Sequence, residues 1–247
     1  MKIIIILFLH AVVGLKHFTI TNQVDHENLK ILIESSKRFN DSIIVLKPTE
    51  SKWINGYKIK YVHEYITDFT DDELILITDA HDVYMMNSHQ DITNEFNRLK
   101  TLDPKMEILI SAEVGLWPPQ TKKEDYPGFN KRSVFPYVNS GGIIGYVGSF
   151  KRVYNDKYDI NMCDQYSWAQ WYLKSLKNET FPVIRMDFEN NIFLSMFTMR
   201  SHDLIITEDT FKHKRTSGYP KMIHFNGDKG GYKDYANRLR NFVNKNI

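Results

Sequence analysis

Glu73-Leu-Ile-Leu-Ile-Thr-Asp79-Ala-His81-Asp82-Val83 is the stretch from which the fold of this chain can be inferred. Its four consecutive Leu and Ile residues are typical of a strand buried on both faces, in a sheet covered by helices. Ligands of open α/β sheets collect at the carboxyl ends of strands, and this strand ends next to Asp79 and Asp82. Two such carboxylates can hold a hard divalent cation, with a diphosphate completing its shell. An isolated Asp-x-x-Asp is more often a helix cap beside a solvated side chain, so the other motifs matter.

The composition predicts one α/β domain. At 247 residues the chain can bury one core, and its 32 basic and 30 acidic residues give a formal net charge of +2. This balance does not favour nucleic acid as a partner. The single cysteine, Cys163, excludes a disulfide within the chain.

The amino terminus, MKIIIILFLHAVVG at residues 1–14, predicts a cleavable signal peptide. It combines one lysine with an apolar stretch too short to span a bilayer, and it ends in small residues. The alternative is a buried first strand within residues 3–9. A signal peptide would leave residues 15–247 in the endoplasmic reticulum lumen or secreted, without a membrane span. Glycosylation sequons at Asn40 and Asn178 fit that compartment, although such triplets also arise by chance.

The remaining pattern alternates apolar strands with amphipathic helices, which predicts a mostly parallel central sheet flanked by helices. The expected strands are 17–21, 42–46, 73–78, 107–113 and 136–146, and the expected helices are 27–39, 57–65, 92–102, 149–154, 164–173 and 233–245. A long polar loop is expected at residues 117–132, and loops of that length inside a compact domain are usually functional or disordered.

Three further motifs carry polar groups. In Asn139-Ser-Gly-Gly the glycines permit a positive φ or the close approach of another group. Asp164 opens an aromatic-rich helix, where it can cap the helix or face a cleft. His224 begins a segment that continues through Gly227 to Lys229; neutral imidazole binds metals, whereas glycine-rich backbone and lysine suit phosphate. Taken singly, these motifs are also explained as a turn, a cap and a hydrogen-bonded core histidine.

The order of the motifs, from about Phe18 to Phe242, resembles the glycosyltransferase domain of the multifunctional procollagen lysyl hydroxylases. The series is Asp-x-x-Asp, Ser-Ala-Glu113 with Trp117-Pro, Asn-Ser-Gly-Gly, Asp-Gln, and His-x-Asn-Gly with a nearby Lys. The Asn-Ser-Gly-Gly and His-x-Asn-Gly blocks are its most specific parts. The resemblance implies a single-domain, GT-A-like nucleotide-sugar transferase fold that uses Mn²⁺ and a UDP-sugar.

The resemblance also implies a role for individual residues. Those that match the manganese ligands of the family are Asp79, Asp82 and His224. Those that match positions around the nucleotide and its phosphates are Thr21, Lys58, His81, Gly227 and Lys229. Those that correspond to the catalytic pocket for the donor sugar and the acceptor are Trp117, Asn139 and Asp164.

The chain departs from the family pattern at three places. His81 stands where the family usually has a tyrosine expected to stack on uracil, and imidazole can also stack. The family's run of aspartates before Asp-Gln is reduced to Asn161-Met-Cys-Asp164, which leaves one acid. Loss of the other acids could lower the rate or change the acceptor. Tyr61 replaces a tryptophan conservatively.

The function implied by the resemblance is manganese-dependent transfer of glucose from UDP-glucose to galactosyl-hydroxylysine in collagen-like proteins. Transfer of galactose from UDP-galactose to hydroxylysine is the alternative. The glucosyl reaction of the family forms an α-linkage from UDP-α-glucose and would be retaining, which needs a carboxylate nucleophile, for which Asp164 is the candidate, or a front-side path assisted by UDP. An inverting galactosyl transfer would instead need a general base near the acceptor. A catalytically idle domain that binds collagen or a partner, and a phosphate-cleaving metalloenzyme, are two further hypotheses. The three retained metal ligands argue against the idle domain.

Overall fold

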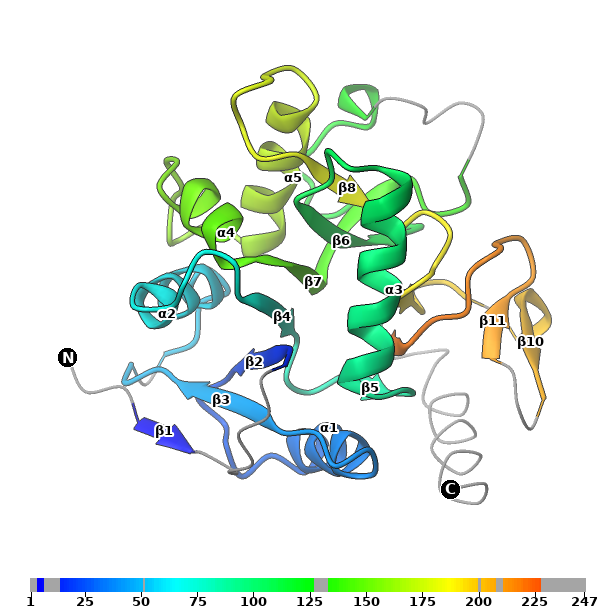
Figure 1. Ribbon diagram of the computed structural model, residues 1–247, viewed down its shortest axis with the longest axis horizontal. Coiled ribbons are helices and arrows are strands. Elements are labelled where there is room, and N and C mark those ends of the chain that lie inside the picture. Colours follow the sequence, from blue (N-terminus) through cyan, green and yellow to red (C-terminus); the bar gives the residue numbers. More distant parts are fainter. Residues whose placement is uncertain are drawn as a thin grey trace.

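The computed structural model describes residues 14–50, 52–126, 133–199, 201–207 and 211–227, and the backbone of residues 4–6. A seven-stranded sheet with the order β1-β3-β2-β4-β7-β6-β8 forms its centre (Figure 1). Its strands are β1 (Ile4–Ile6), β2 (Lys16–Ile20), β3 (Ile43–Lys47), β4 (Leu74–Thr78), β6 (Ile108–Glu113), β7 (Tyr137–Tyr146) and β8 (Ile184–Met186).

The direction of the strands confirms a mostly parallel sheet. Strands β3, β2 and β4 are parallel to one another, as are β6 and β8, whereas β7 runs antiparallel to its neighbours β4 and β6. Strand β1 pairs antiparallel with β3 at one edge. It lies within the segment predicted to be a signal peptide, whose removal stays a prediction.

Helices cover both faces of this sheet. One face carries α2 (Tyr57–Ile66), α4 (Val147–Tyr154) and α5 (Asp164–Ser175), and the other carries α1 (Glu27–Lys37) and α3 (His89–Leu102) (Figure 1). Side chains alternate along β4, so that Ile75 and Ile77 belong to the core under α2, α4 and α5, while Leu76 belongs to the core under α1 and α3. Because both faces are covered, β4 is apolar from Leu74 to Ile77, as its sequence predicted, and ends in the buried Thr78.

Helix α3 begins earlier than the helix predicted from residue 92. Ser88 is its N-cap, and the Ser88 side chain and that of Asp91 each accept a backbone hydrogen bond from the other residue. This capping box satisfies two backbone N–H groups and starts the helix at His89.

A second, three-stranded sheet positions the carboxyl-terminal part of the described chain. Strand β12 (Met222–His224) lies between β5 (Val83–Met85), to which it is antiparallel, and β9 (Phe193–Ser195), to which it is parallel. In this register His224 is paired with Val83, directly after the Asp-x-x-Asp motif. Strands β5 and β9 were not predicted as members of a separate sheet, because their short apolar runs carry no information about their partners.

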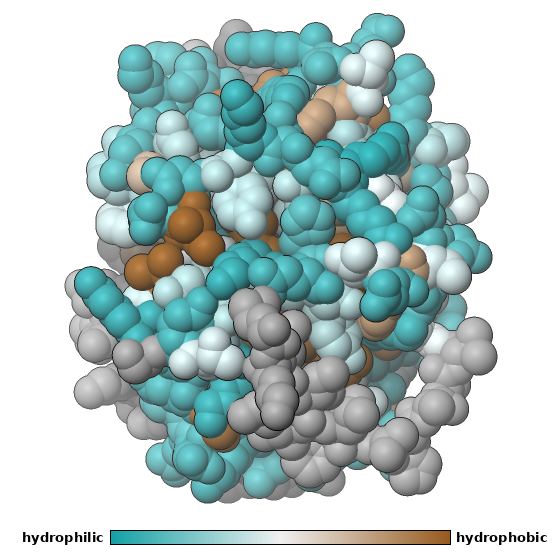
Figure 2. Space-filling view, turned by 90° about the vertical axis from the view of Figure 1, so that its left-hand side faces the viewer, coloured by the Kyte–Doolittle hydropathy of each residue, from teal (hydrophilic) through white to brown (hydrophobic). Residues whose placement is uncertain are grey.

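The remaining elements lie at the periphery. The loop predicted at 117–132 contains a short 3₁₀ helix, Lys123–Asp125, and a second 3₁₀ helix, Ser201–Asp203, precedes the hairpin of β10 (Leu204–Ile206) and β11 (Phe211–His213). The helix predicted at 233–245 lies outside the described residues. Figure 2 shows the face that carries α2 and α4, where the described residues are mostly hydrophilic and apolar ones gather in small groups. Among the described helices, none is long and apolar enough to cross a membrane.

Candidate active site with a metal-binding triad

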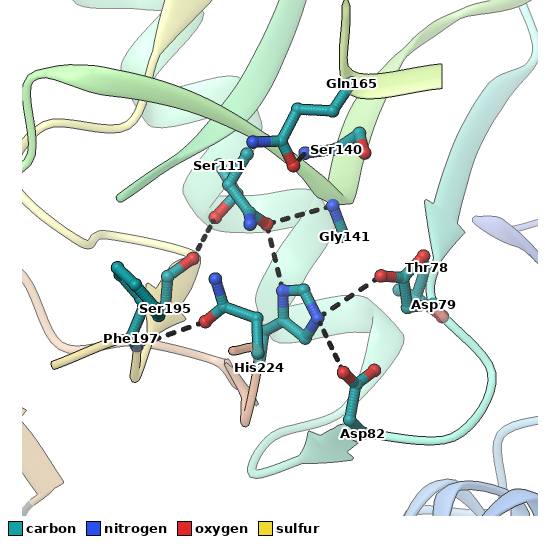
Figure 3. A network of polar contacts seen from close by, with 12 residues as sticks. Thr78, Asp79, Asp82, Ser111, Ser140, Gly141, Gln165, Ser195, Phe197 and His224 are labelled. Carbon is teal, nitrogen blue, oxygen red and sulfur yellow. Dashed lines mark hydrogen bonds and ion pairs between the residues drawn. The ribbon is translucent and has the colours of Figure 1, made fainter. Parts of the chain in front are cut away.

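Two carboxylates and one imidazole converge where β4 and β12 end. Asp79 Oδ2 lies 3.3 Å from His224 Nε2, and Asp82 Oδ2 lies 3.2 Å from the same nitrogen. One ligand atom from each of the three residues lies within 4.8 Å of the other two. Figure 3 shows both carboxylates directed at the imidazole edge. The three residues predicted to bind a metal therefore meet in space.

Backbone hydrogen bonds hold these residues in register. The N–H of Phe225 donates to the carbonyl of Asp82 at 2.7 Å, and the N–H of Asp79 donates to the carbonyl of Gly141 at 3.2 Å. The loop after β4 is thereby tied to β12 on one side and to β7 on the other. The geometry of the triad is set by two sheets rather than by a flexible loop.

Asn139 fixes the orientation of the imidazole. Its Oδ1 lies 2.9 Å from His224 Nδ1 and also accepts a hydrogen bond of 2.9 Å from the N–H of Gly141. Because an amide oxygen only accepts, Nδ1 carries the proton and Nε2 faces the carboxylates. With the proton on Nδ1, the buried Nε2 can only accept a hydrogen bond, and the carboxylates of Asp79 and Asp82 have no proton to donate to it. An imidazole held in this way is prepared to bind a cation.

The first glycine of the Asn-Ser-Gly-Gly motif, Gly141, lies directly against the imidazole of His224. A Cβ atom there would lie 2.0 Å from His224 Cε1 and 2.2 Å from Nδ1. No side chain fits in that space, so the glycine permits β7 to approach the imidazole closely.

The charges of the triad fit a divalent cation. Burial would lower the pKa of His224, but the charge of Asp82 and the hydrogen bond to Asp79 raise it to about 10. The two carboxylates therefore require a positive charge beside them. Two carboxylate oxygens and one imidazole nitrogen are a suitable donor set for Mn²⁺, which would supply that charge with His224 neutral.

Lys58 and Asp164 form a buried ion-pair network behind the triad. Lys58 Nζ lies 2.6 Å from Asp79 Oδ1 and 2.7 Å from Asp164 Oδ2. Burial opposes the charge of Lys58, but Asp164 and Asp79 raise its pKa well above the ordinary value. Burial would likewise raise the pKa of Asp79, but Lys58 and His224 hold it well below the ordinary value.

Asp164 itself neither caps α5 nor lines the cavities described next. The N-cap of α5 is Cys163, whose side chain makes no capping bond to the described residues. The side chain of Asp164 is only 3% exposed, and Lys58 is its counter-ion. Its predicted role as a nucleophile stays a prediction, and its observed place is that of a residue that positions Lys58.

Two cavities share the acidic pair as a common wall. The first, of about 520 Å³, is lined by Asp79, Asp82 and the predicted nucleotide contacts Thr21, Lys58 and His81. The second, of about 470 Å³, is lined by Asp79, Asp82, His224 and three other predicted residues, Trp117, Asn139 and Gly227. The fold thus collects these predicted site residues around one acidic centre. Lys229 lies outside the described residues.

In the first cavity, two imidazoles are stacked. The ring of His81 lies 4.3 Å from that of His26, centroid to centroid, at an interplanar angle of 15°. His81 Nε2 is also 3.1 Å from Thr21 Oγ1, which accepts a hydrogen bond from the N–H of Gln23. His26 was not predicted as a site residue, because a single histidine before a helix carries no specific signal.

In the second cavity, Glu113 is a buried carboxylate to which the sequence motifs gave no role. Gln165 Nε2 donates to its Oε1 at 2.6 Å, and Asn226 Nδ2 donates to its Oε2 at 2.8 Å. Burial raises the pKa of Glu113, and these hydrogen bonds offset the rise in part. Its place in Ser-Ala-Glu, at the end of a predicted strand, was the available signal. Trp117, on the rim, has 57% of its surface exposed.

Gly227 supports the wall of the second cavity. Its φ is +100°, a conformation that favours glycine, and a Cβ there would lie 2.1 Å from Phe197 Cδ2. The side-chain oxygen of Asn226, the preceding residue, accepts hydrogen bonds from the N–H groups of Met196 and Phe197. The His-x-Asn-Gly motif therefore supplies a candidate metal ligand, a clamp for Glu113 and a turn that only glycine adopts easily.

Similarity to known proteins identifies the family of this chain. No curated protein matches the chain. Among solved structures, a glycosyltransferase involved in the glycosylation of the major capsid of PBCV-1 matches with a TM-score of 0.48 and 11% identity, covering 93% of this chain and 98% of that one. A cytidylyltransferase, IspD of Francisella tularensis, matches with a TM-score of 0.40 and 13% identity, covering 70% of this chain and 90% of that one.

Both TM-scores are low, so the identification depends on the family match. Residues 14–247, which contain the triad and both cavities, match the family described as the PLOD GT domain. The chain belongs to the PLOD glycosyltransferase-domain family.

Proposed function

We propose that this glycosyltransferase uses Mn²⁺ to transfer a hexose from a UDP-sugar to an acceptor hydroxyl. The observation that carries the proposal is the shared wall of the two cavities, where Asp79 and Asp82 lie beside His224. A cation at this position would face both spaces. The nucleoside then belongs in the first cavity, and the transferred sugar and its acceptor belong in the second.

The bound cation would neutralise the charge that develops on the diphosphate as the glycosidic bond breaks. Asn139 keeps the imidazole of His224 turned toward that position. Lys58 holds Asp79 through the carboxylate oxygen that does not face the imidazole, so the acidic side chain cannot rotate away. Preorganised ligands of this kind lower the cost of charge rearrangement during the reaction.

Glu113 is the residue to which we assign the proton transfer. Among the described residues that line the second cavity, it is the acidic side chain outside the metal-binding pair. In the transfer, the bond between the anomeric carbon and the diphosphate oxygen breaks and a bond from that carbon to the acceptor oxygen forms. In an inverting transfer, as for the galactosyl pair, the hydroxyl proton of the acceptor passes to Glu113, whose pKa is raised toward the range of a useful base. In a retaining transfer, as for the glucosyl pair, the departing diphosphate assists the acceptor hydroxyl, and Glu113 orients that hydroxyl.

The proposed substrates are those implied by the resemblance to the family. The resemblance of the motifs to the lysyl hydroxylase transferase domain supports UDP-glucose as donor and galactosyl-hydroxylysine of collagen-like chains as acceptor, with UDP-galactose and hydroxylysine as the other pair. The corresponding compartment is the lumen of the secretory pathway or the cell exterior.

Release of UDP tests the proposal directly. Purified protein is incubated with Mn²⁺, a panel of UDP-sugars and a galactosyl-hydroxylysine peptide, and UDP is measured over time. We expect turnover with one UDP-hexose, its loss on chelation, and a fall of roughly 10²-fold or more in Asp82→Ala. The exposed Asp68→Ala is the matched control and should behave as the wild type. Equal turnover in Asp82→Ala and the wild type would refute the metal assignment.

A further inference from the structure

We propose that His26 is a nucleobase-binding residue, which forms with His81 a platform of two stacked imidazoles in the first cavity. This inference rests on the proposed function, because it takes the donor to be a nucleoside diphosphate sugar. It adds a residue and a binding mode that neither the motifs nor the family match assigns.

The geometry of the pair is that of an aromatic stack. A centroid separation of 4.3 Å and an interplanar angle of 15° leave no room for a third ring between the two imidazoles. A planar base can therefore bind only on an outer face or along an edge of the pair. Both residues line the cavity, so a base bound there would lie beside the pair.

The position of His26 is fixed independently of any ligand. His26 is the N-cap of α1, and its Nδ1 accepts a hydrogen bond of 3.1 Å from the N–H of Asn28. That bond requires the neutral tautomer with the proton on Nε2, which lies on the other side of the ring. The helix thus presents a rigid ring with an N–H donor directed away from its own backbone.

Capping alone does not explain a histidine at this position. Asn, Asp and Ser are the preferred N-caps and provide the same hydrogen bond without a ring. The ring of His26 is not buried in either core and instead stacks on His81 at the wall of a cavity of about 520 Å³. A ring that is unnecessary for the cap and exposed to the nucleotide cavity is suited to stack on a heterocycle.

His81 contributes the second ring in a fixed orientation. Its Nε2 is 3.1 Å from Thr21 Oγ1, at the end of β2, so the ring cannot turn freely. His81 follows Asp79 by two positions and precedes Asp82 by one, which places the platform one residue from the cation-binding side chains.

Binding measurements on the intact chain test the inference. Dissociation constants for UDP and for inorganic pyrophosphate are measured by titration calorimetry in the presence of Mn²⁺, for the wild type, for His26→Asn and for the control His202→Asn. Asn keeps the N-cap but removes the ring, and His202 is an exposed histidine outside both cavities. Thermal denaturation checks that the three proteins are equally folded.

We expect His26→Asn to weaken UDP binding about tenfold, the effect of losing one stacking contact with a base, while pyrophosphate binding stays within about twofold. An unchanged UDP affinity, or an equal loss for UDP and pyrophosphate, would overturn the role of His26. A wild type that binds UDP no better than pyrophosphate would overturn the nucleotide donor itself, and the inference with it. The two failures are therefore distinguishable.

Discussion

Lys58 binds the carboxylate oxygen of Asp79 that does not face the metal-binding position: Nζ lies 2.6 Å from Oδ1, while Oδ2 lies 3.3 Å from His224 Nε2. One side chain thus connects the cation-binding position to a buried lysine. Because Lys58 also binds Asp164, the first turn of α5 is coupled to the end of β4 through a single ammonium group.

Replacing Lys58 by Met is expected to leave two acidic groups without their cation. Breaking a buried ion pair by removing one partner costs about 3–5 kcal/mol, so the free energy of unfolding should fall by about that amount. Lys60→Met, in the same helix, removes the part-exposed pair with Glu50 and should cost less than about 1 kcal/mol. Chemical denaturation of both variants compares the two values. Equal losses would mean that the Lys58 network does not stabilise the fold.

Replacing Asn139 by Ala is expected to weaken Mn²⁺ binding without removing a ligand. The hydrogen bond from His224 Nδ1 is lost, and removal of a residue that orients a metal ligand typically costs 10–100-fold in affinity, roughly. Asn97→Ala, an exposed asparagine in α3, is the control. Titration of Mn²⁺ by its electron paramagnetic resonance signal provides the measurement. Wild-type affinity in Asn139→Ala would show that Asn139 does not position His224.

Substitutions of Glu113 and Asp164 are expected to affect turnover differently, and the difference identifies the carboxylate that takes part in the reaction. Glu113→Gln should lower kcat by roughly 10²–10⁴ with little change in the Kd of UDP, because the residue acts on the acceptor. Asp164→Asn should retain more activity and mainly lower stability, because Asp164 pairs with Lys58 and does not line the described cavities. The kcat of both variants and their free energies of unfolding decide between them. Loss of turnover in Asp164→Asn alone would restore Asp164 as the nucleophile.

The free energy of unfolding is expected to depend on pH because His17 and His89 form a buried pair. His17 Nδ1 lies 3.1 Å from His89 Nε2, and burial lowers the pKa of His89 to about 4. The unfolded chain therefore binds more protons than the folded chain between about pH 6.5 and pH 4. The contribution of the neutral His89 to the free energy of unfolding is fully present above about pH 6.5. It is lost as the pH falls toward the folded-state pKa, by about 3 kcal/mol at most.

Unfolding free energies measured from pH 4 to pH 7.5 check this expectation. The wild type should lose more stability over that range than His89→Gln, in which the titrating ring is absent. The exposed His202→Gln should follow the wild type. Parallel curves for the wild type and His89→Gln would contradict a role for the buried pair.

The sequence predicted those parts of the fold that depend on local pattern. The apolar run before Asp79 identified β4 because burial on both faces leaves a one-dimensional signature. The direction of β7 and the sheet formed by β5, β12 and β9 were not predictable, because pairing partners depend on contacts between distant segments.

The site residues that belong to specific motifs were predicted from the sequence. Those that depend on a single residue, or on contacts between distant segments, were not. Asp79, Asp82 and His224 were assigned together through the resemblance, and the structure brings them together. The clamp on Glu113 depends on amides from two distant segments, and the stack on His81 depends on a lone His26. Neither arrangement has a signature in one stretch of sequence.

The binding of Mn²⁺ to His224 variants tests the metal site most directly. Titrations followed by electron paramagnetic resonance compare the wild type with His224→Asn and with the control His202→Asn. We predict one tight site in the wild type and in the control, and a loss of at least about tenfold in affinity in His224→Asn. An Mn²⁺ affinity in His224→Asn equal to that of the wild type would contradict the assignment of Asp79, Asp82 and His224 to one ion.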